Sequence, residues 1–410
     1  MENRLLHLGP SIGGAVRLPA SKSITNRILA ISALAHTRAK ISNVASCDDA
    51  GAMERVVGRL EEGGTIDIGA AGTAMRFATA LLSVASGEYL LTGSERMRHR
   101  PIKPLVDALR SIGADIEYVG AEGFPPLHIK GRRLQGGTVE IDAGVSSQYI
   151  SALLMVAPQL ERGMLLTLRG KVVSRPYIDL TIGLMKQFGA EVGWTGAQTI
   201  EVKPRSYDRT EPFVIENDWS AASYWYELIA ISPDETAKIE LSGLWPDSLQ
   251  GDRRVEQLFR PLGVKTQWSD DGIVLTKSPA ARLVPYEADL TEQPDLAQTL
   301  VVTCCMQERP FRLAGLQSLR LKETDRIAAL QNELRKLGYV VSNHGDTIME
   351  WSGEKCAAEA HPSIHTYDDH RMAMAFAPAA MKTGDLVICN PQVVSKSYPE
   401  FWNDLLRCNF

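Results

Sequence analysis

The sequence predicts an α/β protein built from repeated units in which a helix is followed by a strand. Four segments share one pattern, in which an amphipathic helix ends at a glycine and a short β-like run follows. The four glycines, at positions 113, 189, 263 and 338, lie about 75 residues apart. A weaker copy at 53–68 and the C-terminal FWNDLLRCNF bring the set to six. Repeats of this kind are typical of α/β folds, and six copies divide into two groups of three.

The composition sets limits on the class of protein. A chain of 410 residues with 44% hydrophobic and 23% charged residues is long enough for two or three globular domains. The net charge of −5 argues against a general polyanion binder, so no nucleic-acid partner is expected. No apolar run is typical of a signal peptide or a membrane span. Six cysteines without metal-binding spacing indicate a reduced, cytoplasmic protein.

Short strands are expected between the helices. The runs GMLLTL (163–168), KIEL (238–241) and DLVIC (385–389) have the apolar, β-branched character of strands. The turn-rich KPRSYDRTEP precedes a candidate domain boundary near 216–220. The first group of three repeats would end there.

Polar residues gather where helices are expected to start. The N-terminal end of a helix carries unpaired N–H groups and partial positive charge, which favour an anion and disfavour a cation. Taken singly, each start has a simple explanation, such as capping by Ser146 or Ser174 or a solvated basic loop. Taken together, they contain more Lys, Arg, Ser and Gly than capping requires. In the first half these starts are LPASKSITNR (18–27), GAAGTAMR (69–76), SERMRHRP (94–101), SSQ (146–148) and SRPY (174–177).

The charged run at 321–338 shows the problem most clearly. LKETDRIAALQNELRKLG has helical periodicity and a terminal glycine, which places Lys322 and Arg326 on one face of the first turn. Glu323 and Asp325 could neutralise them in a surface salt-bridge patch. The alternative is that a ligand anion supplies the missing charge. In either case Asp325 is expected to be a local partner of these cations.

The second half adds acids at helix starts. Asp218 and the DDHR segment (368–371) are expected to cap helices, and Lys396 taken alone would be an exposed lysine. Asp295 and Glu323 are the candidate general bases, and Lys22 and His370 the candidate acids. No metal-ligand spacing is present, so no metal is expected. The inventory suits a small ligand with phosphate and carboxylate groups.

With these motifs assembled, the chain resembles the EPSP synthase family, the 3-phosphoshikimate 1-carboxyvinyltransferases. The resemblance covers nearly the whole chain, and ten motifs occurring in one order are very specific. In order, the motifs are LPASKSITNR, GAAGTAMR, LTGSERMRHRPIKPLVDAL, SSQYISALL, VSRPYIDLT, DWSAASY, PD, LRLKETDR, DDHRMAMAF and SKSYPEF.

The resemblance implies a fold and a reaction. The family's enolpyruvyl transferase fold has two domains, each of three βαβαββ-type units in a pseudo-threefold arrangement, with the active site in the interdomain cleft. Residues 1–20 and 217–410 would form one domain and residues 21–216 the other. The family transfers the enolpyruvyl group of phosphoenolpyruvate to the 5-hydroxyl of shikimate 3-phosphate, releasing phosphate. This is a step toward chorismate and the aromatic amino acids, and glyphosate occupies the phosphoenolpyruvate site. A cytoplasmic monomer without cofactors is implied.

The resemblance also assigns roles residue by residue. Asp295, Glu323 and Lys22 would carry the proton transfers, in a division that the sequence leaves open, with His370 in support. The expected shikimate 3-phosphate ligands are Lys22, Ser23, Arg27, Ser146, Ser147, Gln148, Ser174, Tyr177, Asp295, Ser318 and Lys322. The expected phosphoenolpyruvate ligands are Lys22, Gly72, Arg100, Gln148, Arg326, Arg371 and Lys396.

The chain departs from the family pattern at a few positions. Ala70 and Ser318 stand where the family usually has Asn, and Arg175 stands where Lys is commoner. These changes bear on ligand affinity and glyphosate sensitivity more than on the reaction. Two alternatives are a UDP-N-acetylglucosamine enolpyruvyl transferase and a non-catalytic anion-binding protein. The first uses a cysteine in a mobile loop, which Cys47 does not match, and the second would be expected to have lost Asp295, Glu323 or Lys22.

Overall fold

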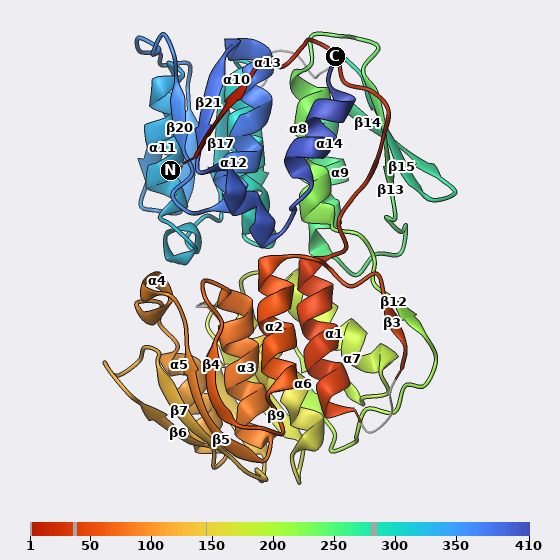
Figure 1. Ribbon diagram of the computed structural model, residues 1–410, viewed down its shortest axis with the longest axis vertical. Helices are drawn as coiled ribbons and strands as arrows, with labels where there is room; N and C mark the ends of the chain where they lie inside the picture. Colours follow the sequence, from red (N-terminus) through yellow and green to blue (C-terminus); the bar gives the residue numbers. More distant parts are fainter. Residues whose placement is uncertain (1, 36–38, 145, 280–284) are drawn as a thin grey trace. The chain divides into compact units, whose positions relative to one another are not determined.

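The computed structural model describes residues 2–35, 39–144, 146–279 and 285–410. The chain divides into two compact units (Figure 1). The first, called here the insert unit, is Ala20–Ile215. The second, the terminal unit, joins the segment up to Pro19 with Glu216–Phe410.

The insert unit is a mixture of helices and strands interleaved along the chain. Its helices are α1 (Lys22–Leu34), α2 (Asp48–Gly58), α3 (Gly72–Val84), α4 (Glu95–Arg98), α5 (Lys103–Ser111), α6 (Ser147–Val156), η1 (Ala157–Gln159) and α7 (Arg175–Gln187). Its strands are β3 (Ile41–Ser42), β4 (Gly64–Asp67), β5 (Gly87–Thr92), β6 (Asp115–Tyr118), β7 (Leu127–Gly131), β8 (Gly137–Asp142), β9 (Met164–Arg169), β10 (Val192–Gly196), β11 (Thr199–Val202) and β12 (Phe213–Val214).

The terminal unit likewise interleaves helices and strands. Its helices are α8 (Trp219–Ile231), η2 (Gly251–Arg254), α9 (Val255–Phe259), η3 (Arg260–Leu262), η4 (Pro294–Leu296), α10 (Ala297–Met306), η5 (Leu319–Leu321), α11 (Arg326–Lys336), α12 (His370–Phe376), η6 (Ala377–Ala379), α13 (Ala380–Thr383), η7 (Pro391–Lys396) and α14 (Phe401–Cys408). Its strands are β1 (Asn3–Leu6), β2 (Ala15–Arg17), β13 (Lys238–Ser242), β14 (Val264–Ser269), β15 (Gly272–Lys277), β16 (Tyr286–Asp289), β17 (Phe311–Ala314), β18 (Ser342–His344), β19 (Ile348–Trp351), β20 (Ser363–His365) and β21 (Leu386–Cys389).

Four sheets share one topology, which explains the sequence repeat. In each, two parallel strands are followed by an antiparallel hairpin, in the orders β4-β5-β7-β6, β8-β9-β11-β10, β2-β13-β15-β14 and β16-β17-β19-β18. The other two repeats are reduced to the parallel pair β3-β12 and the three-stranded sheet β1-β21-β20. The predicted α/β class and the expected strands at 163–168, 238–241 and 385–389 are confirmed.

The repeated glycines end helices for a conformational reason. Gly113, Gly189, Gly263 and Gly338 have φ of +99°, +96°, +86° and +91°, a region that residues with a Cβ enter only at a cost. Each therefore stops its helix and turns the chain toward the next strand.

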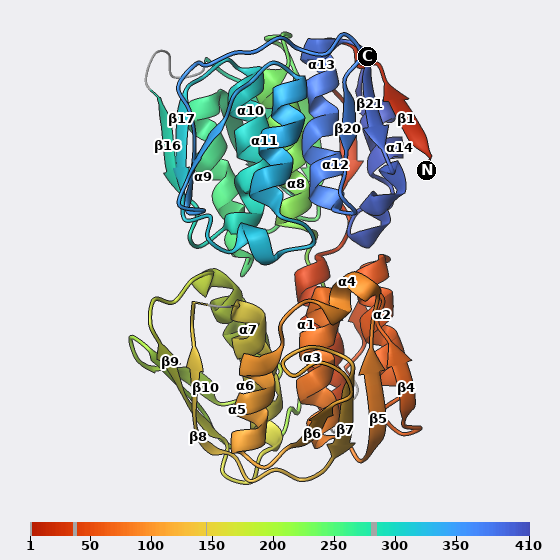
Figure 2. The ribbon, with the colours of Figure 1, turned by 90° about the vertical axis from the view of Figure 1, so that its left-hand side faces the viewer.

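The core of each unit contains three helices that contact one another pairwise. In the insert unit these are α1, α3 and α6, and in the terminal unit α8, α10 and α12 (Figure 2). Every residue of α10 and α12 is buried, as are all but two residues of α3. Sheets and further helices surround each trio, so the starts of the central helices are held in place by packing.

In the part of the chain that the structure describes, no helix is long and apolar enough to cross a membrane.

One helix start differs from the expectation. The helix predicted over 321–338 begins only at Arg326, because Asp325 is its N-cap and accepts a hydrogen bond from the backbone N–H of Ala328 at 3.1 Å. Lys322 has extended backbone and is not in the first turn. Asp325 pairs with Arg320 at 2.9 Å, so the expectation that it neutralises Lys322 and Arg326 is wrong. The charged residues lie in the loop before the helix, where their side chains can turn toward other elements.

Candidate active site

The starts of α3 and α6 meet in the insert unit. Ser146 caps α6 by accepting a hydrogen bond from the backbone N–H of Gln148 at 3.2 Å. The side-chain amide of Gln148 donates to Oγ1 of Thr73, in the first turn of α3, at 3.1 Å. Ser21 caps α1 in the same way. Backbone N–H groups and small polar side chains are thereby brought to one end of the central helices.

Arg27 ties α1 to two neighbouring helices. It is 3% exposed, and its guanidinium donates to the hydroxyl of Thr181 at 2.7 Å, the hydroxyl of Ser151 at 3.2 Å and the carbonyl of Tyr177 at 3.3 Å. Burial lowers the pKa of Arg27 to about 10, so the group keeps its charge at neutral pH. These acceptors are hydroxyl and carbonyl oxygens without net charge, so the positive charge of Arg27 is available to attract an anion.

Lys22 lies in the first turn of α1. Its Nζ is 3.3 Å from Oδ2 of Asp49, in the first turn of α2, and the Asp49 side chain is 4% exposed. A lysine in the first turn opposes the helix dipole, and the buried carboxylate of Asp49 offsets that cost.

Gly72 brings the backbone at the start of α3 close to a cation. A Cβ added at Gly72 would lie 2.6 Å from Nη1 of Arg100 and 3.1 Å from its Cζ. Arg100 is 8% exposed, although it was read from the sequence as part of a basic loop. The absence of a side chain at residue 72 is therefore what allows the Arg100 guanidinium to lie against the first turn of α3.

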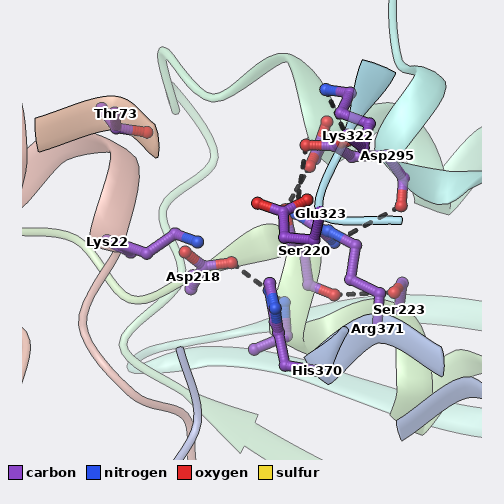
Figure 3. Close-up of polar contacts among 12 residues, drawn as sticks. Lys22, Thr73, Asp218, Ser220, Ser223, Asp295, Lys322, Glu323, His370 and Arg371 are labelled. Carbon is purple, nitrogen blue, oxygen red and sulfur yellow. Dashed lines mark hydrogen bonds and ion pairs between the residues drawn. The ribbon is translucent and has the colours of Figure 1, made fainter. Parts of the chain in front are cut away.

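In the terminal unit three cations converge on Asp295. Its carboxylate lies 3.0 Å from Nζ of Lys322, 3.0 Å from Nη1 of Arg326 and 3.2 Å from Nη2 of Arg371. Figure 3 shows Asp295 with Lys322, Glu323 and Arg371. Arg371 also donates to the backbone carbonyl of Asp295 at 3.3 Å and to the hydroxyl of Ser220 at 3.4 Å. The starts of α8, α10 and α12 thus meet around one guanidinium.

These cations set the charge state of Asp295. Burial by itself would raise the pKa of Asp295, but Lys322, Arg371 and Arg326 together hold it well below its usual range. The carboxylate is therefore ionised at neutral pH and is a weak base for as long as all three cations contact it.

Arg326 is the most enclosed member of the cluster. It is 1% exposed and donates to Asp369 at 2.7 and 3.3 Å, to Glu323 at 3.0 Å and to Asp295 at 3.0 Å. Burial would lower the pKa of Arg326, but Asp369, Glu323 and Asp295 raise it above its ordinary value. One cation therefore fixes the positions of three carboxylates.

Lys396 belongs to the same network. Its Nζ lies 3.5 Å from Oε1 of Glu323, and the residue is 7% exposed. The expectation of a lone exposed lysine is wrong, because η7 turns the side chain inward.

Among the described residues, no group of three or more His, Cys, Asp or Glu side chains could hold a metal ion.

Comparison with known proteins places this geometry in a family. Residues 8–65 and 54–405 match the family model described as EPSP synthase (3-phosphoshikimate 1-carboxyvinyltransferase). The chain belongs to the EPSP synthase family. It is 52% identical over 406 residues to a 3-phosphoshikimate 1-carboxyvinyltransferase of Bacteroides fragilis strain YCH46, covering 99% of this chain and 98% of that one. It is 36% identical to one of Vibrio atlanticus strain LGP32, covering 99% of each.

Solved structures show the same fold at lower identity. An EPSP synthase from Acinetobacter baumannii superposes with a TM-score of 0.78 at 20% identity, covering 100% of this chain and 98% of that one. The enolpyruvyl transferase NikO from Streptomyces tendae gives 0.75 at 17%, covering 99% and 97%. The predicted enolpyruvyl transferase fold is confirmed by these likenesses.

The structure joins many of the residues that the EPSP synthase resemblance assigned to ligands. In the terminal unit Asp295, Lys322, Glu323, Arg326, Arg371 and Lys396 form one connected network. In the insert unit Arg27 contacts the backbone of Ser23 and Tyr177. Ser147 is the first residue of α6.

Three more of the assigned residues lie at helix starts. Ser318 precedes η5, and among the described contacts none joins its side chain to the Asp295 network. His370, the first residue of α12, is 2% exposed with Nδ1 3.8 Å from Asp369. Ser174 does not cap α7, although capping was its simplest explanation, because its backbone is left-handed and its side chain makes no cap bond.

Sequence reasoning missed residues that hold the candidate ligands. Asp369 was read as a cap and does accept the N–H of Arg371 at 2.9 Å, but it also binds Arg326. Asp49 and Thr73 were not singled out at all. Ser220 lies in the DWSAASY motif but was given no role from the sequence, yet it contacts Arg371 and donates to Asp252. Position within the DDHR and GAAGTAMR motifs was the only signal that pointed to Asp369 and Thr73.

Proposed function

We propose that this protein transfers the enolpyruvyl group of phosphoenolpyruvate to the 5-hydroxyl of shikimate 3-phosphate, giving 5-enolpyruvylshikimate 3-phosphate and phosphate. Full-length identity of 52% to a named 3-phosphoshikimate 1-carboxyvinyltransferase supports the reaction. The observation that carries the chemistry is the contact of Asp295 with Lys322, Arg326 and Arg371. A base held among cations suits a reaction in which an alcohol is deprotonated beside anionic substrates.

The polar helix starts of the insert unit suit anion binding. We assign Lys22, Ser23, Arg27, Ser146, Ser147, Gln148, Ser174 and Tyr177 to shikimate 3-phosphate. The support is a buried cation, Arg27, and N-terminal N–H groups on three central helices. Gly72, Arg100 and Gln148, with Lys22, are assigned to phosphoenolpyruvate, because the first turn of α3 is where a backbone and a guanidinium lie together.

The network of the terminal unit suits the proton transfers. The 5-hydroxyl must lose a proton as it attacks C2 of phosphoenolpyruvate, and C3 must gain one. Collapse of the tetrahedral intermediate then releases phosphate and a C3 proton. We assign Asp295 to the hydroxyl and Glu323, with Lys22, to C3, and we assign Arg326, Arg371 and Lys396 to phosphoenolpyruvate and Lys322 and Ser318 to the shikimate side.

Substrate anions would activate the base. While Lys322, Arg326 and Arg371 all contact Asp295, its low pKa makes it a poor proton acceptor. When a substrate carboxylate or phosphate takes over contacts of Arg371 and Lys322, their attraction for Asp295 weakens and its basicity rises. Binding of the anion and activation of the base are then coupled.

The test is release of phosphate from the purified protein. Mixed with shikimate 3-phosphate and phosphoenolpyruvate, with a chelator and no added metal, it is expected to release phosphate and form the enolpyruvyl ether. Replacement of shikimate 3-phosphate by UDP-N-acetylglucosamine is the matched control. Release only with the nucleotide sugar, or with neither acceptor, would contradict the proposal.

We also propose that the protein acts as a cytoplasmic monomer on these small molecules, without nucleic acid or membrane. The support is its net charge of −5 and the finding that none of its six cysteines is in a disulfide. Light scattering after size-exclusion chromatography would give a mass near 45.0 kDa for a monomer.

A further inference from the structure

The start of α7 has an unusual backbone conformation. Ser174, the residue before the helix, has φ +55° and ψ +37°, in the left-handed region. A helix N-cap normally has extended backbone and uses its side chain to cap the helix, and Ser174 does neither. For a residue with a Cβ this conformation is strained, so the surrounding structure must hold it in place.

Three side chains close a triangle immediately after Ser174. The guanidinium of Arg175 lies over the ring of Trp194, 4.2 Å from its centroid. The indole Nε1–H of Trp194 donates to Oδ1 of Asp179 at 2.8 Å, and the other oxygen of Asp179 lies 3.6 Å from Nε of Arg175. The triangle joins the first two turns of α7 to β10, and Figure 2 shows this strand beside the helix.

A second irregularity lies on the strand side. The pairing of β10 with β11 shifts register between Trp194 and Gly196, as in a β-bulge. Bulges re-aim a side chain relative to a regular strand. Two local departures from regular geometry, at Ser174 and at Trp194, therefore lie at the two ends of one set of contacts.

We propose that Arg175, Trp194 and Asp179 form a clamp that positions Ser174 and Tyr177 for the shikimate phosphate. The inference rests on the proposed function, in which Ser174 and Tyr177 are ligands of shikimate 3-phosphate. The clamp residues act through the helix start and touch no substrate. A planar guanidinium at this distance from the indole centroid can stack on the ring, which the ammonium of a lysine at 175 could not do.

The experiment measures how tightly each variant binds one substrate. Trp194→Ala removes both the ring under Arg175 and the donor to Asp179. We expect its Kd for shikimate 3-phosphate, by calorimetry without phosphoenolpyruvate, to rise about five-fold. The KM for shikimate 3-phosphate should rise with it, while kcat and the KM for phosphoenolpyruvate change by less than about two-fold. Trp194→Phe keeps a ring under Arg175 and should restore part of the affinity.

Arg209 supplies a matched control at the other end of the same helix. Its guanidinium lies over Phe188, the C-cap of α7, with 5.6 Å to the ring centroid, so Arg209→Ala loosens α7 away from Ser174. It should lower the melting temperature and leave the Kd unchanged. An unchanged Kd in Trp194→Ala, or equal increases in the two variants, would overturn the clamp. Failure of the wild type to bind shikimate 3-phosphate would instead overturn the proposed function together with the clamp.

Discussion

At the residue scale, Asp295 is a buried carboxylate that the neighbouring cations keep ionised. Burial disfavours the ionised form, yet the three cations hold the pKa of Asp295 well below its usual range. Removing the carboxylate would leave Lys322, Arg326 and Arg371 close together with less negative charge among them. The residue therefore contributes to stability as well as to chemistry.

We predict that Asp295→Asn lowers kcat by about 10²- to 10⁴-fold and lowers the unfolding temperature at neutral pH. Because the folded-state pKa is depressed, the stabilisation is present above the unfolded pKa of about 3.9 and is lost as pH falls toward the folded pKa. The difference in melting temperature between wild type and variant should thus shrink as the pH is lowered from about 5 toward the folded-state pKa. A difference that stayed constant across that range would argue against the ion network.

Gly72 illustrates a position where one methyl group matters. Its added Cβ would lie 2.6 Å from Nη1 of Arg100, so Gly72→Ala must displace that guanidinium. We predict an increase of about ten-fold in the KM for phosphoenolpyruvate and weaker inhibition by glyphosate, with little change in the KM for shikimate 3-phosphate. Gly58→Ala is the control, since a Cβ there meets nothing within 4 Å. If Gly72→Ala left both phosphoenolpyruvate and glyphosate binding unchanged, Arg100 would not be their ligand.

At the scale of elements, the periodicity of the sequence predicted the fold class, whereas the charged run at 321–326 did not predict where α11 begins. The repeated helix–glycine–strand pattern correctly predicted the α/β class, because the positive φ at Gly113 and Gly338 is a local requirement that the sequence records. The start of α11 was misjudged because Asp325 competes with the preceding residues as the N-cap, and Lys322 remains outside the helix. Helix propensity alone could not distinguish a start near Lys322 from the observed start after Asp325.

The contacts between helix starts could not be read from the sequence in the same way. Arg326 and Asp369 are separated by 43 residues along the chain, and their hydrogen bond depends on the tertiary packing that brings the starts of α11 and α12 together. The same holds for Gln148 and Thr73, which lie on different central helices. Motif order placed these residues at helix starts, while side-chain partners such as Asp49 and Asp369 emerge only from tertiary packing.

At the scale of the whole molecule, the insert unit is one continuous segment of the chain, and it separates the two segments that form the terminal unit. Each unit buries its own set of apolar side chains. The terminal unit depends on residues before the insert, since β1 pairs with β21 and β2 pairs with β13. The two ends of the interruption lie together, because the N–H of Asp218 donates to the carbonyl of Pro19 at 2.9 Å.

We therefore predict that residues 20–215 expressed alone fold into a cooperative unit, whereas residues 216–410 alone do not. The second fragment lacks β1 and β2 and leaves the edges of β13 and β21 unpaired, which favours aggregation. Joining Pro19 to Glu216 through a short linker should restore its folding, because Pro19 is hydrogen-bonded to Asp218, two residues after Glu216. Near-ultraviolet circular dichroism and urea unfolding would check all three chains. A well-folded 216–410 fragment without the N-terminal strands would show that they add little to the terminal unit, and a linked chain that stays unfolded would show that this unit needs the insert to fold.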